Sequence, residues 1–412
     1  MNNRLFLPAD ILIPRSAELE RWSVIACDQF TSDPDYWDRV EKLVGDAPST
    51  LRLILPEAHL GRPDTDEKIA AVNRRMLDYL GGEIFTLLES SYIYVERRLS
   101  DGAIRRGLVG AVDLEAYSYR GEATPIRPTE RTVEERLPPR VKVRSGAVLE
   151  LPHIMLFIND PEDRLIGCAG ELKSDANMIY DFELMEKGGH ITGWRLSGQD
   201  SDRLGAVLDG LGGERRGDEP LFAIGDGNHS LAAAKLCWDR LKAGLTPEQC
   251  ECHPARYALV ELVNLYDDAV SFEPIHRVIF GVEPETFLRQ AEERFAAMST
   301  EGDEKKLIII TRDGSCELNL KGVSLAELVS VSDSFLEELR DRDGCAIDYI
   351  HGDEEAAALA SRENSGGILL PRLDKAELFG SIAARGVYPK KSFSIGHAVD
   401  KRYYLECRRI DE

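Results

Sequence analysis

Six consecutive residues near the middle of the chain carry side chains suited to chemistry rather than to packing. They are Gly225, Asp226, Gly227, Asn228, His229 and Ser230. The two glycines permit a close backbone approach or a positive φ. Asp226 is a candidate to bind Mg²⁺ or accept a proton, and His229 to donate to a phosphate oxygen or act as a general acid-base. We therefore expect this segment, here called the central turn, to bind an anionic, phosphorylated ligand.

The residues on either side of the central turn predict a strand before it and a helix after it. Apolar residues fill positions 221–224, and helix-forming residues fill positions 231–236. A turn at a helix N-terminus aims unpaired backbone N–H groups at whatever lies above it. The structural alternative is a tight link in which Asp226 caps the helix and His229 bonds a neighbouring strand. We favour binding, because a link alone does not explain three polar side chains crowded at a helix start.

Composition and charge limit the classes of function. The chain has 412 residues, 43% of them hydrophobic, and a net charge of -22. That charge argues against nucleic acid as a partner, because a phosphate backbone would be repelled. Two basic islands, at 127–144 and 385–412, interrupt the acidic background. No apolar run reaches the roughly eighteen residues of a membrane span, so we expect a cytoplasmic protein with no membrane partner. Whether the chain forms a homo-oligomer stays open.

The alternation of apolar runs and turn signals predicts an α+β protein with two domains. We expect a mixed-sheet domain over 1–280 and a smaller α+β domain over 281–412 that ends in a basic tail. The proline- and charge-rich stretch 121–146 lacks periodicity, so it is predicted to be a long basic loop within the first domain. The cluster at 250–253, with two cysteines and a histidine, lacks the second ligand pair of a zinc site.

Four short motifs in order along the chain resemble the uncharacterised family called domain of unknown function 1015. They are Glu130-Arg131-Thr132, Asp226-Gly227-Asn228-His229-Ser230, Pro274-Ile275-His276-Arg277 and Pro389-Lys390-Lys391-Ser392. The resemblance implies that Glu130, Arg131, His276, Arg277, Lys390 and Lys391 contribute to a phosphate or nucleotide site with Gly225, Gly227, Asn228 and Ser230. The family is often encoded beside serine-biosynthesis enzymes, which points to serine or phosphoserine as the substrate.

The central turn is also similar to the nucleotide-binding motif of the ParB and sulfiredoxin superfamily. That likeness implies a strand-turn-helix that holds the phosphates of ATP or ADP, with Mg²⁺ near Asp226. It also implies a general base at a strand end, for which Asp28 is the candidate; a turn or helix-cap role for Asp28 is the alternative. Ser230 departs from the arginine common at its position, and a hydroxyl gives one neutral donor instead of a charged fork. Charge must then come from a basic island.

These observations favour an enzyme that acts on a phosphorylated small molecule. The preferred reaction is nucleotide-dependent phosphoryl transfer to a hydroxyl such as that of serine. This reaction needs positioning and charge neutralisation more than covalent chemistry, and a helix N-terminus, an acid and a few cations can supply both. A phosphoserine-type phosphatase and a nucleotide- or metabolite-binding regulator without turnover are the alternatives.

Overall fold

The chain folds into two units that are not the predicted domains. The computed structural model describes residues 4–15 and 17–411. The first unit combines Met1–Val270 with His397–Glu412, and the second is Ser271–Gly396. The predicted domains, 1–280 and 281–412, instead have their boundary near residue 280 and place the C-terminal tail in the second domain.

Strand pairing explains why the C-terminal tail belongs to the first unit. Strand β19 (Tyr403–Tyr404) pairs with β3 (Val24–Ile25), and β20 (Arg408–Arg409) pairs with β7 (Leu149–Glu150). Both pairs are antiparallel and join residues more than two hundred positions apart in sequence. No local sequence pattern predicts pairing between strands that lie so far apart in the chain.

A mixed ten-stranded sheet forms the centre of the first unit. Its main path runs β6-β11-β8-β12-β5-β4-β10-β9, with β1 beside β5 and β2 beside β4. The strands are β1 (Phe6–Leu7), β2 (Ala9–Pro14), β4 (Phe85–Arg98), β5 (Ile104–Asp113), β6 (Ile126–Pro128), β8 (Met155–Ile158), β9 (Met178–Glu183), β10 (His190–Ser197), β11 (Phe222–Asp226) and β12 (Tyr257–Asn264). The helices are α1 (Leu19–Trp22), α2 (Pro34–Val44), α3 (Thr65–Gly81), α4 (Leu137–Arg144), α5 (Arg164–Glu171), α6 (Gln199–Gly213), α7 (Asn228–Lys242) and α8 (Pro247–Cys252).

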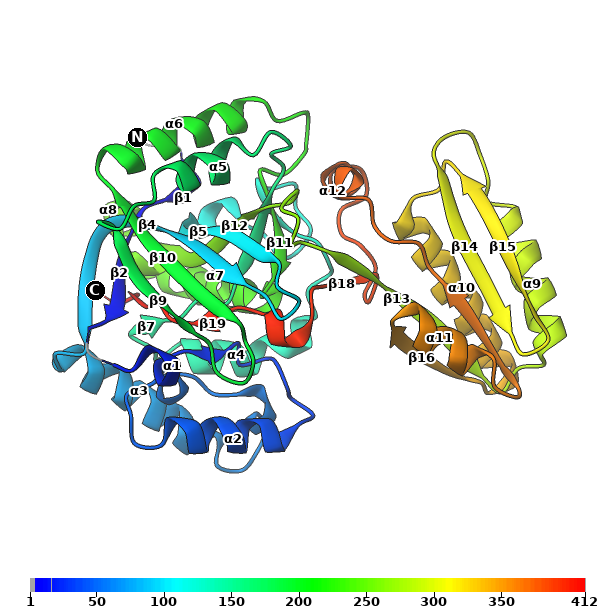
Figure 1. Cartoon of the computed structure of the whole chain (residues 1–412), viewed down its shortest axis with the longest axis horizontal. Coiled ribbons are helices and arrows are strands. Elements are labelled where there is room, and N and C mark those ends of the chain that lie inside the picture. The colour runs from blue at the N-terminus through cyan, green and yellow to red at the C-terminus, as the bar shows by residue number, and fades with distance from the viewer. Residues whose placement is uncertain (1–3, 16, 412) are drawn as a thin grey trace. The chain divides into compact units, whose positions relative to one another are not determined.

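Alternating side chains divide the core of the first unit between the two faces of the sheet. In β4, Ile93 and Val95 join one hydrophobic cluster, whereas Tyr92 and Tyr94 join the other. This is the period-two pattern of a strand buried on both faces. Helices α5 and α6 cover one face, and α1 to α3 cover the other (Figure 1).

The basic stretch 121–146 is not the loop that the sequence predicted. It contains β6 and α4, and α4 packs against α7. Two prolines stand at the start of α4, where their missing N–H groups cost no helical hydrogen bond. Leu137 and Val141, four positions apart, are both buried. The prolines therefore stand at the start of a helix, where the sequence predicts a long loop.

The second unit has its own antiparallel sheet and helices. The sheet order is β15-β14-β17-β13-β16, with β18 also paired to β13. Its strands are β13 (Phe272–Phe280), β14 (Glu304–Thr311), β15 (Gly314–Lys321), β16 (Ala346–His351), β17 (Ser365–Leu369) and β18 (Phe393–Ile395). Its helices are α9 (Pro284–Ala296), α10 (Leu325–Asp343), α11 (Asp353–Ala360) and α12 (Leu378–Arg385).

The predicted α+β class with a large mixed sheet is confirmed. The strand, turn and helix expected around residues 221–236 are present as β11, Gly227 and α7. None of the described helices combines the length and apolar character needed to cross a bilayer.

Candidate functional site

Both glycines of the central turn are required by its geometry. Gly227 has φ +76, and a Cβ there would lie 2.9 Å from the Ile154 Cα. Gly225 lies at a shift of register between β11 and β8, and a Cβ there would lie 2.6 Å from the Phe157 ring. A β-bulge of this kind bends a strand and redirects the residues that follow it. The two glycines thus let the chain leave the sheet and begin α7 at once.

The N-terminus of α7 has no side-chain cap. Its N-cap is Gly227, which offers no side-chain acceptor, and the Ser230 N–H already donates to the Gly227 carbonyl oxygen at 3.0 Å. Asp226 does not cap the helix, because its Oδ1 accepts from the N–H of Gly227 itself at 2.9 Å. Unsatisfied N–H groups and the helix dipole favour an anion at this position.

The Glu130-Arg131-Thr132 segment docks on the central turn. The Asn228 side chain donates to the Glu130 carbonyl oxygen at 3.0 Å and accepts from the Thr132 hydroxyl at 3.3 Å. Asn228 therefore joins the two segments, so a ligand contact from this residue would come from its backbone. Arg131, between these two contacts, is exposed and forms no ion pair with any described residue. An arginine without such a partner thus stands beside the turn.

One hydrogen bond fixes the tautomer of His229. Its Nε2 accepts from the backbone N–H of Val133 at 3.2 Å. A ring nitrogen that accepts carries no proton, so the proton of the neutral ring is on Nδ1. In this tautomer Nδ1 is the donor atom of the His229 ring and Nε2 is the acceptor.

A lysine from the C-terminal tail contacts the acid of the central turn. The Nζ of Lys401 lies 3.1 Å from the Oδ2 of Asp226, and 17% and 18% of the two side chains are exposed. The basic tail thus delivers a cation to the turn, although the lysines that matched the family motif were Lys390 and Lys391.

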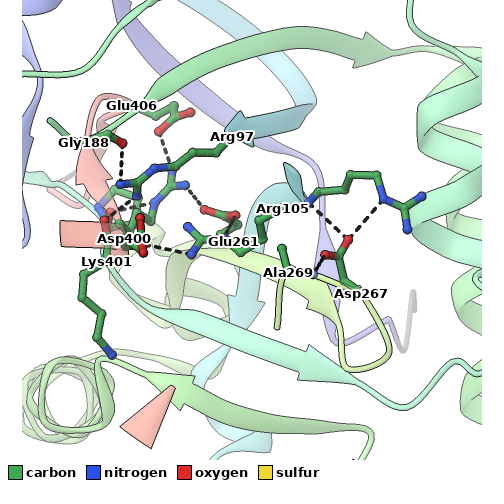
Figure 2. A network of polar contacts seen from close by, with 12 residues as sticks. Arg97, Arg105, Gly188, Glu261, Asp267, Ala269, Asp400, Lys401 and Glu406 are labelled. Carbon is green, nitrogen blue, oxygen red and sulfur yellow. Dashed lines mark hydrogen bonds and ion pairs between the residues drawn. The ribbon is translucent and has the colours of Figure 1, made fainter. Parts of the chain in front are cut away.

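Buried arginines hold the backbone around Lys401. Arg97 donates to the carbonyl oxygens of Lys401, Val399 and Gly188. Arg105 donates to the Asp400 carbonyl oxygen at 3.0 Å. Figure 2 shows the Lys401 backbone within this group of contacts and its side chain leading away from them.

Carboxylates compensate the buried positive charge beneath this segment. Arg402 pairs with Glu261 and with Glu406, and these three residues are 5%, 2% and 0% exposed. The Arg402 Nε also donates to the carbonyl oxygen of Pro152 at 3.1 Å, next to His153. We call Arg97, Arg105, Glu261, Arg402 and Glu406 the buried charge network. It fixes both Lys401 and His153 relative to the sheet.

A hydrogen-bonded chain leads from strand β3 to the central turn. Cys27 N–H donates to the Tyr404 hydroxyl oxygen at 3.2 Å, and that hydroxyl lies 2.7 Å from His153 Nδ1. The Nε2 of His153 lies 3.0 Å from the Ser230 hydroxyl and 3.8 Å from Asp28 Oδ2. The Asp28 carboxylate favours a proton on Nε2, so Nδ1 accepts from Tyr404. That arrangement leaves the Ser230 hydroxyl proton for another acceptor.

Local charges keep Asp28 ionised. Burial alone would raise its pKa, but the neighbouring His153 ring, a hydrogen bond from Gln29 and the charge of Lys401 lower the pKa below its ordinary value. A low pKa makes Asp28 a weak base until a cation nearby moves or is neutralised. Burial and the Asp28 charge raise the pKa of Cys27 to about 12, so this thiol stays protonated and is no nucleophile.

Four predicted binding residues lie in the second unit and make their contacts there. His276 is 1% exposed; its Nε2 lies 2.9 Å from Asp353, and its Nδ1 accepts from the Leu370 N–H. Arg277 is fully buried and pairs with Asp333 at 2.9 Å.

Lys390 and Lys391 are exposed residues of the same unit. The Nζ of Lys391 lies 4.0 Å from the centre of the Tyr349 ring, and its carbonyl oxygen accepts from Arg277 at 2.8 Å. His276, Arg277 and Lys391 therefore contact residues of their own unit.

Whether the central turn fits Mg²⁺ depends on the oxygen atoms that a bound nucleotide would add to Asp226. The described residues include no group of three or more His, Cys, Asp and Glu side chains arranged to hold a metal ion. Asp226 offers one carboxylate, whose Oδ2 already contacts Lys401. Mg²⁺ is commonly held by one or two carboxylates together with substrate phosphates and water. Asp226 therefore fits an ion that arrives with a nucleotide, and not a resident metal centre.

Sequence reasoning missed Lys401, His153 and Tyr404. Lys401 belongs to a basic island that the sequence marked as a source of cations, but no motif distinguished it from its neighbours. His153 and Tyr404 are 251 positions apart, and only the β3–β19 pairing brings Tyr404 to Cys27.

Comparisons with known proteins give a family and distant structural likenesses. A family model described as protein of unknown function (DUF1015) matches residues 9–343. No curated protein matches the chain. A solved structure of a free serine kinase in complex with AMP is 12% identical, with a TM-score of 0.36, over 72% of this chain and 90% of that chain.

Two further solved structures are similarly distant. A conserved hypothetical protein from Pyrococcus furiosus is 14% identical, with a TM-score of 0.31, over 72% of this chain and 90% of that chain. SbnI with a C-terminal truncation from Staphylococcus aureus is 9% identical, with a TM-score of 0.34, over 70% of this chain and 82% of that chain. Likenesses this distant leave function to the chain's own residues.

Proposed function

The chain belongs to the DUF1015 family, whose description names no reaction, and from its own residues we propose that it transfers a phosphoryl group from a nucleotide to the hydroxyl of a small metabolite. One observation carries the proposal: Lys401 contacts Asp226 beside the uncapped N-terminus of α7, and its charge also lowers the pKa of Asp28. A cation, an anion-binding helix end and two carboxylates are thus gathered in one place.

The binding role falls to the central turn and the residues docked on it. The first N–H groups of α7 would receive phosphate oxygens, with Nδ1–H of His229 as a further donor. Arg131 and Lys401 would supply positive charge in place of the arginine that Ser230 replaces. This arrangement is what the ParB/sulfiredoxin-like interpretation of the motif requires, and ATP or ADP is the proposed donor.

The catalytic role proposed for Asp28 is to orient the acceptor hydroxyl and take its proton. Lys401 holds the Asp28 pKa low while it faces the carboxylates. When Lys401 turns to a phosphate, its charge is neutralised there, and Asp28 becomes a better base. Asp226 would then be released to the Mg²⁺ that accompanies the nucleotide, which would neutralise developing charge on the phosphates.

A turnover assay with matched variants tests the proposal. The full-length protein is incubated with Mg²⁺, ATP or ADP, and an acceptor set of L-serine, glycerol and cyclohexanol, and products are followed by ³¹P NMR. We expect a phosphorylated acceptor with one of the nucleotides. Asp226→Asn and His229→Ala should each lower the rate by about a hundredfold or more. Their Tm should stay within a few degrees, whereas unfolding of both would show that these residues act through structure alone.

Two outcomes would replace the proposal with another function. Tight nucleotide binding by calorimetry, without turnover of any acceptor, would indicate a nucleotide-binding regulator. Release of inorganic phosphate from phosphoserine in the absence of nucleotide would indicate a phosphatase that uses the same turn.

A further inference from the structure

A cavity of about 140 Å³, partly open to solvent, adjoins the central turn in the first unit. Ser230 and Ala233 of α7 form part of its wall. Much of the remaining wall is aliphatic and buried, including Leu55, Met76 and Leu259. A hollow of this size beside a candidate active site is large enough for a small ligand.

The charged groups at the cavity are already paired with one another. Arg140 pairs with Glu57, and Arg144 pairs with Glu150 at 2.6 Å. A charged ligand would lose part of its hydration on entering and would have to break one of these pairs to gain a charged partner at the wall. The wall thus favours a neutral ligand.

Ser230 gives the cavity one polar contact point. Its hydroxyl lies 3.0 Å from His153 Nε2, and a hydroxyl has one donor and two acceptor positions. With Nε2 as the donor, the Ser230 proton remains available to a second oxygen. Because Ser230 belongs to both the cavity wall and the central turn, a ligand hydroxyl bonded to it would lie next to the phosphate-binding N–H groups.

We propose that this cavity binds the acceptor of the phosphoryl transfer, a neutral alcohol with an apolar body of about six carbon atoms and its hydroxyl at Ser230. The size follows from the volume, since an apolar cavity of roughly 150 Å³ holds a benzene ring. The proposal rests on the function proposed above. The proposed acceptor differs from serine in charge. The ammonium and carboxylate groups of serine would find every charged group at the wall already paired.

The reaction at this site is a simple displacement. The acceptor oxygen forms a bond to the terminal phosphorus of the nucleoside di- or triphosphate, and the bond from that phosphorus to the bridging oxygen breaks. The bridging oxygen leaves with the electron pair on the shortened nucleotide. Asp28, whose Oδ2 lies 3.8 Å from the His153 ring nitrogen that faces Ser230, takes the hydroxyl proton.

Cyclohexanol and L-serine provide a matched pair of probes, because both have seven non-hydrogen atoms and one hydroxyl. Binding of each to the full-length protein is measured by calorimetry with and without ADP. We expect saturable binding of cyclohexanol at least tenfold tighter than that of serine. Ala233→Leu fills the cavity and should weaken cyclohexanol binding at least tenfold, whereas Ala243→Leu, at the exposed end of the same helix, should change it less than twofold.

A second filling variant protects the test against misfolding. Ala147→Leu adds the same bulk at a half-buried position of the wall and should also weaken cyclohexanol binding. Equal binding to wild type and to both filled variants, or tighter binding of serine than of cyclohexanol, would overturn the proposal.

ADP binding on the same samples separates this inference from the proposed function. If ADP binds but cyclohexanol does not saturate, the cavity proposal fails and the phosphate site stands. If cyclohexanol binds in the cavity but neither ADP nor ATP binds, the nucleotide-dependent function fails and the proposed acceptor role fails with it.

Discussion

The first unit contains two clusters in which positive and negative side chains face each other, and both clusters include residues of the C-terminal segment. The two clusters differ in burial. In the buried charge network, Glu261 and Glu406 are 2% and 0% exposed and face guanidinium groups. At the central turn, Asp226 and Lys401 keep 18% and 17% of their side chains exposed. The turn also has an uncapped helix N-terminus and an exposed arginine beside it.

The difference separates charges that organise the fold from charges available to a ligand. A carboxylate that is fully buried against a guanidinium cannot exchange its partner without a large desolvation cost. A half-buried lysine can change partners at small cost, because water assists the exchange. The neighbours Lys401 and Arg402 therefore take different roles: Arg402 anchors the segment, and Lys401 reaches the site.

Breaking the buried charge network should produce the largest effect on stability. Glu261→Gln removes the negative charge beside Arg402 and Arg105 and leaves buried cations uncompensated. We expect a loss of about 3–5 kcal/mol in the free energy of unfolding. Urea denaturation followed by circular dichroism measures it.

The control for this prediction is Glu171→Gln, which makes the same change in an exposed pair with Arg203. It should cost no more than about 1 kcal/mol. Equal losses for the two variants would show that burial does not distinguish the network from an ordinary surface pair.

Adding a side chain to the central turn should have the next largest effect. Gly227→Ala places a Cβ at φ +76 and 2.9 Å from the backbone of Ile154. Strain of this kind costs about 1–3 kcal/mol, and nucleotide affinity should fall because the helix start moves. Gly210→Ala, in α6 with no neighbour within 4 Å and no positive φ, should leave stability unchanged or raise it. The free energy of unfolding and the ADP affinity are measured for both variants, and equal values for the two would contradict the prediction.

The central turn could be predicted from the sequence because its determinants are local. Two glycines, an apolar run before them and helix formers after them specify β11 and α7 within about fifteen residues. The buried charge network could not be predicted, because Glu261 and Arg402 are 141 positions apart and each resembles a surface residue in sequence.

The motifs of the C-terminal half show the limit of local reasoning about the site. Pro274-Ile275-His276-Arg277 and Pro389-Lys390-Lys391-Ser392 were predicted to bind phosphate, but their polar groups are used within the second unit. Lys401 follows only ten residues after Lys391, yet it belongs to the first unit because β19 pairs with β3. Long-range strand pairing, and not the motif, selects the lysine that reaches Asp226.

Removing the lysine at the central turn should weaken ligand binding more than it weakens the fold. Lys401→Met keeps the length of the side chain and removes the charge that contacts Asp226. We expect ADP affinity to fall about tenfold, or about 1.4 kcal/mol, with a smaller change in the free energy of unfolding. Lys390→Met, at an exposed lysine of the second unit, is the matched control and should leave ADP affinity unchanged. If the two variants bind ADP equally well, Lys401 does not take part in phosphate binding.

The smallest expected effect is the pH dependence that Asp28 contributes to stability. Burial opposes ionisation of this carboxyl, but His153, Gln29 and Lys401 lower its pKa below the ordinary value. The unfolded chain has a pKa of about 3.9 for aspartate, so the folded state binds this proton less readily than the unfolded state. The stabilisation is therefore complete above about pH 4 and is lost as the pH falls through the lower folded pKa.

Asp28→Asn should reduce the loss of stability between pH 7 and pH 3, whereas the exposed control Asp175→Asn should keep the wild-type dependence. Identical urea midpoints for wild type and Asp28→Asn at both pH values would show that the charges at the central turn do not act on Asp28.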